Sequence, residues 1–168
     1  MLLPLDFDNI PNYKNVMEQY KNLDFDKDNK YSVPYTWGVV ALVYNKEMVK
    51  EKPKSFDVLW DKEYKGQILM FNNSRDAMAI AMKLKGIDPG VVTKEDVDTA
   101  AGYLRQQKPL LKKYVMDQVF TEMEGGQAAL APYYAGDIIT MMGNNENLDY
   151  VLPQEGSNLF VDSMCIPK

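Results

Sequence analysis

The sequence contains no histidine, which is the side chain that most often acts as a general base near neutral pH. This absence also excludes Ser-His-Asp and Cys-His nucleophilic arrangements and removes the commonest metal ligand. Only one cysteine is present, Cys165, so the chain can form no internal disulfide and no cysteine-based zinc cluster. Because Cys165 stands in an apolar run, we expect it to be a buried structural thiol.

Long apolar runs are also missing, and none approaches the roughly 18 residues that are needed to span a bilayer. No signal peptide is recognisable after Met1, so we expect either a cytoplasmic protein or an export signal outside this sequence. The net charge is −5, from 19 basic and 24 acidic side chains. This balance argues against a nucleic-acid partner, which requires a basic surface, and it is compatible with a cationic ligand.

The length of 168 residues is enough for one domain with a real core, or for one lobe of a larger protein. Short apolar segments alternate with segments of helical periodicity. This alternation indicates a doubly wound α/β sheet, in which ligands bind beyond the carboxyl ends of the strands. The expected strands are 31–44, 67–71, 114–116, 128–132, 150–152 and 159–166, and the expected helices are 10–23, 75–85, 94–107, 119–123 and 135–142.

Two segments near the N-terminal end are unusual. The strand 31–44 contains Pro34 and Gly38, which predicts a strand that bends or changes sheets. The preceding segment 24–30 carries aspartates at alternate positions, like the start of a calcium loop, but Asn29 stands where that loop needs glycine. We therefore expect a solvated turn there.

Three carboxylates follow or lie in expected strands. Asp76 and Asp137 stand in the first turns of their helices, where the helix dipole stabilises a carboxylate even without a ligand. Asp162 lies within the apolar strand 159–166, where a buried carboxylate must be paired or hydrogen-bonded. A ligand ammonium is a reasonable partner for Asp162, because no cationic side chain stands beside it in the sequence.

Aromatic residues accompany these carboxylates. Trp37, Tyr133, Tyr134 and Phe160 are typical core residues, but their rings also suit the methylenes of an alkylammonium ligand. Phe160 points to the same side of its strand as Asp162. Charge-assisted hydrogen bonds of about 1.5–3 kcal/mol each, with cation–π contacts of about 2 kcal/mol or less, reach about −8 kcal/mol after ordering costs. That free energy corresponds to micromolar binding of an organic cation.

Two other interpretations use the same residues. Asp76 and Asp162 together are a candidate carboxylate pair for glycoside hydrolysis, although no specific glycosidase motif is present. The adjacent Tyr133 and Tyr134 resemble the paired phenolates of ferric-ion-binding proteins, which often also recruit a histidine or a carboxylate.

A set of short motifs runs in order through nearly the whole chain: Leu3-Pro-Leu5, Tyr31-Ser-Val-Pro-Tyr-Thr-Trp-Gly38, Ser55-Phe-Asp-Val-Leu-Trp60, Tyr64-Lys-Gly66, Ser74-Arg-Asp-Ala77, Tyr134-Ala-Gly-Asp137, Pro153-Gln-Glu-Gly156, Phe160-Val-Asp-Ser163 and Ile166-Pro-Lys168. Each motif is weak alone, but the ordered set is specific. It resembles the spermidine/putrescine-binding proteins of bacterial ABC importers, which are extracytoplasmic receptors for polyamines.

The resemblance implies a lobe of the type II periplasmic-binding-protein fold, with a doubly wound mixed sheet flanked by helices. Such proteins are about twice this length and have two lobes joined by crossing strands. In this sequence, 1–30 would lead out of a missing first lobe, 31–44 and 162–168 would be the crossing strands, and 45–161 would be the second lobe. The fold would be incomplete without the N-terminal lobe.

The resemblance also implies roles for residues of the second lobe. Asp76 matches an acidic position where glutamate is usual, and Asn73 matches a position where some members have aspartate. Tyr134 replaces a tryptophan of the cleft, and Asp137 matches an aspartate of putrescine-preferring members.

On the last strand, Phe160 and Asp162 match a ring and a carboxylate that contact the ligand, whereas we expect Trp37 to be structural. The implied partners are a polyamine and the membrane permease of an ABC importer. Neither a cofactor nor catalysis is expected, and the protein would be periplasmic or extracellular, either free or anchored by lipid.

Overall fold

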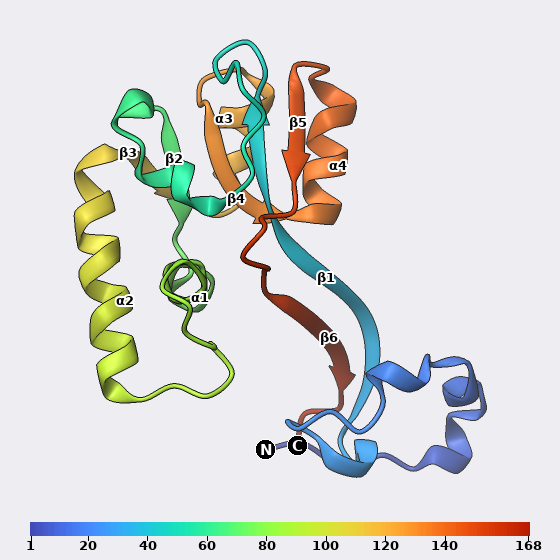
Figure 1. Ribbon diagram of the computed structural model, residues 1–168. Coiled ribbons are helices and arrows are strands. Elements are labelled where there is room, and N and C mark those ends of the chain that lie inside the picture. Colours follow the sequence, from blue (N-terminus) through green and yellow to red (C-terminus); the bar gives the residue numbers. More distant parts are fainter. The chain divides into compact units, whose positions relative to one another are not determined.

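The computed structural model describes all residues, 1–168, and they form two compact units (Figure 1). Unit 1 comprises Met1–Gly38 and Leu159–Lys168, and unit 2 comprises Val39–Asn158. The long strand β1 (Ser32–Asn45) passes from unit 1 into unit 2. None of the helices combines the length and the apolar character that crossing a membrane requires.

Unit 2 is built on a mixed sheet with the strand order β3-β2-β4-β1-β5. Its strands besides β1 are β2 (Ile68–Phe71), β3 (Leu111–Val115), β4 (Leu130–Tyr134) and β5 (Leu148–Val151). Strand β2 is parallel to β3 and to β4, whereas β1 is antiparallel to β4 and β5. Because β2, β3 and β4 run in the same direction, the segments that follow them emerge at one edge of the sheet.

Two pairs of helices accompany this sheet. They are α1 (Ser74–Leu84), α2 (Lys94–Gln107), α3 (Gln118–Glu124) and α4 (Ala135–Asn144). Helix α1 contacts α2 and β2, and α4 contacts α3, β4 and β5 (Figure 1). The caps follow from the sequence: Asn73 accepts a hydrogen bond from the Arg75 amide, and Thr93 forms a capping box with Asp96. Short 3₁₀ helices fill the connections: η5 (Phe56–Trp60), η6 (Lys62–Tyr64) and η7 (Lys108–Leu110).

The hydrophobic core lies almost entirely in unit 2. All five residues of 40–44 are buried, because β1 lies between β4 and β5 in the sheet. Strand β2 is buried along its whole length, and Ala77, Ile80 and Ala81 form the buried stripe of α1. The predicted α/β class, with strands alternating with helices, is thus confirmed in this unit.

Unit 1 has little core of its own. Its elements are the first part of β1, β6 (Leu159–Cys165), and the 3₁₀ helices η1 (Phe7–Asn9), η2 (Pro11–Asn15), η3 (Glu18–Tyr20) and η4 (Lys27–Asn29). Tyr20 is its only buried hydrophobic residue. The predicted helix 10–23 is wrong, because Val16 and Met17 have extended backbone that separates η2 from η3. A helix of this length is marginal unless it packs an apolar face against a core, and unit 1 offers none.

The turn 24–30 and the single cysteine complete unit 1. Asp26 is buried and accepts hydrogen bonds from the Tyr31 amide at 3.0 Å and the Ser32 hydroxyl at 2.6 Å, so it closes the turn that precedes β1. Cys165 is exposed, contrary to the expectation of a buried thiol. Its strand, β6, pairs only with β1.

Candidate ligand-binding site

Asp76 is the centre of a hydrogen-bonded cluster in unit 2. Its Oδ2 accepts hydrogen bonds from the Asn73 side-chain amide at 2.7 Å and from the Tyr134 phenol at 2.9 Å. Its Oδ1 accepts a third from the Asn158 side-chain amide at 3.3 Å. The sequence-predicted residues Asn73, Asp76 and Tyr134 are therefore brought together.

The sheet topology explains this meeting. Asp76 stands in the first turn of α1, directly after β2, and Tyr134 is the last residue of β4. Because β2 and β4 are parallel neighbours, both residues lie at the carboxyl-terminal edge of the sheet. Asn158 lies at the same edge because its segment is hydrogen-bonded to β1. The Ser157 hydroxyl donates to the Val40 carbonyl, and the Val40 amide donates to the Asn158 carbonyl.

Aromatic rings surround Tyr134. Its ring centroid lies 5.4 Å from that of Phe71 and 5.0 Å from that of Tyr133. Burial, followed by the hydrogen bond to Asp76, raises the pKa of the Tyr134 phenol to about 12. The phenol therefore remains protonated at neutral pH, where it donates to the carboxylate.

Asp137 lies in the first turn of α4, three residues after Tyr134. The structure contains no hydrogen bond or ion pair to its carboxylate among the residues described. Burial, and then the negative charge of Asp117, raise the pKa of Asp137 above its usual value. Asp117 itself accepts a hydrogen bond from the Tyr133 phenol at 3.4 Å.

These three carboxylates, Asp76, Asp117 and Asp137, have no cationic partner. The ion pairs of unit 2 connect lysines to other acids: Asp98, Glu122 and Asp149. Burial and the charges of Asp117 and Asp137 also raise the pKa of the Tyr133 phenol to about 12. Negative charge without a counter-ion, next to aromatic rings, is the environment that an organic cation requires.

In unit 1, Phe160 and Asp162 lie on β6. The Phe160 ring packs over Gly38, and a β-carbon placed on that glycine would lie 2.6 Å from the Phe160 Cζ atom. Asp162 is exposed, so the prediction of a buried carboxylate is wrong. Strand β6 pairs only with β1, which leaves Asp162 open to solvent rather than inside a two-faced core.

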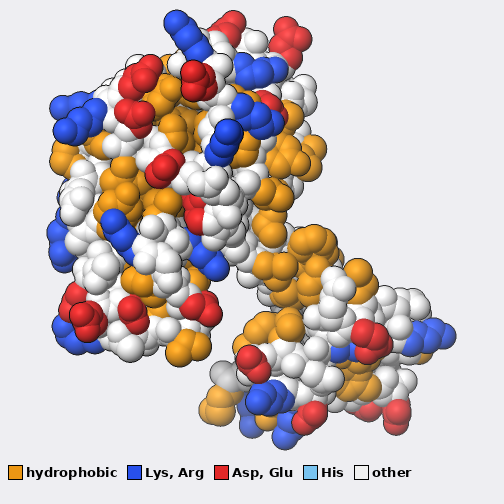
Figure 2. All heavy atoms as spheres, viewed as in Figure 1, with side chains coloured by type: hydrophobic (Ala, Val, Ile, Leu, Met, Phe, Trp, Pro, Cys, Tyr) orange, Lys and Arg blue, Asp and Glu red, His pale blue; other side chains and the backbone are white.

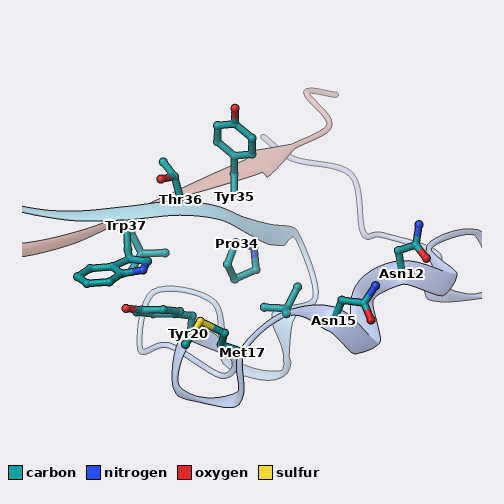
Figure 3. Close-up of a pocket in the computed structure, with 10 residues that line it drawn as sticks. Asn12, Asn15, Met17, Tyr20, Pro34, Tyr35, Thr36 and Trp37 are labelled. Carbon is teal, nitrogen blue, oxygen red and sulfur yellow. The ribbon is translucent and has the colours of Figure 1, made fainter. Parts of the chain in front are cut away.

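Unit 1 also contains an open groove of about 460 Å³ that sequence reasoning did not predict (Figure 3). Tyr20 and Trp37 stack along it with ring centroids 5.6 Å apart, and Met17 lies beside Tyr20. Trp37 is exposed, so it is not the core residue that the sequence favoured. Figure 2 shows many hydrophobic side chains at the surface of unit 1.

Two residues of the unit 2 cluster, Asp117 and Asn158, were not predicted from the sequence. Asp117 follows β3, so a search for carboxylates directly after strands could have found it. The predicted strand 114–116 ended one residue later than β3 does, so Asp117 directly followed it, but the sequence reasoning singled out only the acids after the other strands. Asn158 gave no signal, because a neutral amide in a loop has no distinctive sequence pattern.

Comparison with known proteins places these features in a family. The model of the family described as bacterial extracellular solute-binding protein matches residues 1–168. The chain is 27% identical over 168 residues to the spermidine/putrescine-binding periplasmic protein of Escherichia coli, covering 99% of this chain and 48% of that protein.

Solved structures agree. A spermidine/putrescine ABC transporter substrate-binding protein from Streptococcus pneumoniae superposes with a TM-score of 0.86 and 34% identity, covering 100% of this chain and 52% of that one. The Tp0655 lipoprotein of Treponema pallidum gives a TM-score of 0.91 and 25% identity, with 100% and 54% covered. The chain thus spans about half the length of the relatives it matches. It belongs to the family of bacterial extracellular solute-binding proteins.

Proposed function

We propose that this chain forms about half of an extracytoplasmic receptor that captures a polyamine and delivers it to the permease of an ABC importer. The observation that carries the proposal is the unpartnered carboxylate of Asp137 beside the rings of Tyr133 and Tyr134. Ammonium groups pair with carboxylates, and methylenes pack on ring faces. The names of the relatives, which refer to spermidine and putrescine, support the same ligand class.

In this proposal, unit 2 contributes Asp137, Asp76, Asn73 and Tyr134, and unit 1 contributes Phe160 and Asp162. The exposure of Asp162 suits a residue that meets a ligand from solvent. The role is binding and transport, without catalysis. The protein would act outside the cytoplasmic membrane, as the periplasmic relatives do, and a lipid anchor is compatible with this role.

The organisation proposed from the sequence remains our proposal. The segment 1–30 leads out of a first lobe, 31–44 and 162–168 cross between lobes, and 45–161 is the second lobe. Support comes from unit 1, which has one buried hydrophobic residue and many exposed ones: Met1, Leu2, Leu3, Met17, Phe25, Tyr35, Trp37, Leu159, Met164 and Ile166. Such a surface is typical of one that another part of a protein covers.

A ferric-ion receptor is the alternative within the same fold, but the tyrosines do not favour it. Each phenol donates to a different carboxylate, Tyr133 to Asp117 and Tyr134 to Asp76, so the two rings do not share one acid. A hydrolase using Asp76 is disfavoured as well, because three hydrogen bonds already occupy that carboxylate.

Calorimetry of the full-length protein tests the proposal. Putrescine and spermidine should give saturable heat with micromolar or tighter affinity, and ferric citrate should give neither heat nor a coloured phenolate complex. Heat with another solute but with no polyamine would contradict the polyamine assignment while leaving the family intact.

A further inference from the structure

The hydrogen bonds around Asp76 distinguish it from the other carboxylates of unit 2. A carboxylate offers about four lone-pair positions. Three of them are used by Asn73, Tyr134 and Asn158 at 2.7, 2.9 and 3.3 Å. All three donors are neutral groups of the protein, so the charge of Asp76 is already solvated before any ligand arrives.

The three donors come from three different segments. Asn73 precedes α1, Tyr134 ends β4, and Asn158 precedes β6. Asp76 therefore connects these three segments by hydrogen bonds at the edge of the sheet. Because its Oδ2 holds the Tyr134 phenol, it also sets the orientation of a ring that an alkyl chain would contact.

Asp137 differs in each respect. It is partly buried and accepts no hydrogen bond within the chain, and the charged neighbour that acts on it, Asp117, is also negative. An ammonium group that binds at Asp137 supplies hydrogen bonds that the protein does not. An ammonium group at Asp76 must displace hydrogen bonds that the protein already makes, or use the single remaining lone pair. Leaving a buried polar group unpaired costs about 1–3 kcal/mol, which favours the ammonium at Asp137.

We infer that Asp76 is a positioning residue, which holds the Tyr134 phenol and the Asn158 amide in place, and that the ammonium group pairs with Asp137 rather than with Asp76 in unit 2. This inference rests on the proposed function and revises one part of it, because family resemblance alone assigns Asp76 to the ligand. The glutamate that is usual at this position is longer, and the shorter Asp76 already accepts three hydrogen bonds from its own neighbours.

Calorimetric titration of the full-length protein with putrescine, at about 20 mM and about 300 mM NaCl, separates the two roles because salt screens direct ion pairs. Asp137→Asn should weaken binding and flatten its salt dependence. Asp76→Asn and Tyr134→Phe should each weaken binding by roughly 3- to 10-fold with the salt dependence unchanged. In the Tyr134→Phe background, Asp76→Asn should add less than about twofold, because the two act through one hydrogen bond.

Asp76→Glu provides a second test, since it keeps the charge and lengthens the side chain. A positioning role predicts weaker binding, because the longer side chain disturbs the bonds to Tyr134 and Asn158. Equal or tighter binding by Asp76→Glu, or a salt dependence flattened by Asp76→Asn, would overturn the inference and make Asp76 a direct ligand.

A ligand-free measurement distinguishes failure of this inference from failure of the proposed function. Subtracting the ultraviolet titration of Tyr134→Phe isolates the ionisation of Tyr134, which has a pKa of about 12. Asp76→Asn should lower that pKa by removing a negative acceptor. If the parent protein binds no polyamine, the proposed function fails. The positioning role is tested separately, and it fails if Asp76→Asn leaves the pKa of Tyr134 unchanged.

Discussion

The phenol of Tyr134 donates a hydrogen bond to the carboxylate of Asp76 across 2.9 Å, joining the end of β4 to the first turn of α1. This contact connects residues 58 positions apart in the sequence. It orients an aromatic ring and, at the same time, occupies an acid that would otherwise be open to a cation. Asp137, which has neither a cationic partner nor a hydrogen bond, is the residue on which the binding predictions depend.

Replacing Asp137 with asparagine should weaken putrescine binding by the full-length protein roughly 10- to 100-fold. The reason is the loss of a charge-assisted hydrogen bond of about 1.5–3 kcal/mol, where about 1.4 kcal/mol corresponds to tenfold. Affinity of the parent protein should also fall on acidification, beginning above the usual range of aspartate, because the pKa of Asp137 is raised and only the ionised form pairs with ammonium. Calorimetry between neutral and mildly acidic pH measures both effects.

The matched control is Glu146→Gln, which removes the same charge from an exposed side chain outside the cluster. Its putrescine affinity should stay within about twofold of the parent, since exposed charges contribute little. Equal losses in Asp137→Asn and Glu146→Gln would mean that net charge, rather than the Asp137 contact, drives binding.

Asp137→Asn should also stabilise the ligand-free protein at neutral pH. Folding raises the pKa of Asp137, which means that the folded state disfavours its ionised form. The contribution of Asp137 to the free energy of unfolding is therefore complete below its unfolded pKa. That contribution is lost as the pH rises through its folded pKa. The melting temperature of Asp137→Asn should therefore exceed that of the parent near pH 7, and the difference should shrink toward pH 3. A variant that is less stable at neutral pH would show that the carboxylate is satisfied in a way that the structure does not indicate.

Sequence periodicity predicted unit 2 well because its elements bury their own apolar faces. The stripe of α1 and the continuous apolar strand β2 are local patterns, and both are buried. The caps at Asn73 and Thr93 are equally local, because each side chain bonds within its own first turn. The meeting of Asp76 with Tyr134 followed from one further rule, that parallel strands end at the same edge.

Unit 1 could not be predicted in the same way. Segment 10–23 has helical spacing, but only Tyr20 of it is buried, against Trp37, and the segment forms 3₁₀ turns instead. Asp162 and Cys165 stand in an apolar strand and were expected to be buried, yet β6 pairs only with β1. Whether an apolar strand is buried depends on what covers it, which its own sequence does not encode.

Gly38→Ala should disturb Phe160, because the new methyl group would lie 2.6 Å from the Phe160 Cζ atom. The ring must then shift, which moves a residue that the proposed function assigns to the ligand. We expect a lower melting temperature and weaker putrescine binding.

Gly102→Ala is the control for this substitution, because Gly102 lies in α2 with no atom near the added carbon, and it should be neutral or stabilising. Identical melting temperatures and affinities for Gly38→Ala and the parent would contradict the close packing of Phe160 over Gly38.

Trp37 can report whether another part of the protein covers unit 1. It is 49% exposed in this chain and lines the groove with Tyr20. With Trp60→Phe, Trp37 is the only tryptophan of these 168 residues, and any tryptophan outside them in the full-length protein would be replaced in the same way. Its emission should then be red-shifted in the isolated chain and blue-shifted in the full-length protein. The same emission maximum in both proteins would argue against a covering lobe at this groove.

The central claim is that the receptor holds an organic cation with carboxylates and rings, and a pair of isosteric ligands tests it most directly. Putrescine and 1,4-butanediol have similar length and the same four-carbon chain, but only putrescine carries ammonium groups. Calorimetry of the full-length protein should give saturable binding of putrescine, no measurable binding of the diol, and loss of putrescine binding when Asp137 and Asp162 are both replaced by asparagine. Comparable binding of the two ligands, or undiminished putrescine binding by the double variant, would contradict the claim.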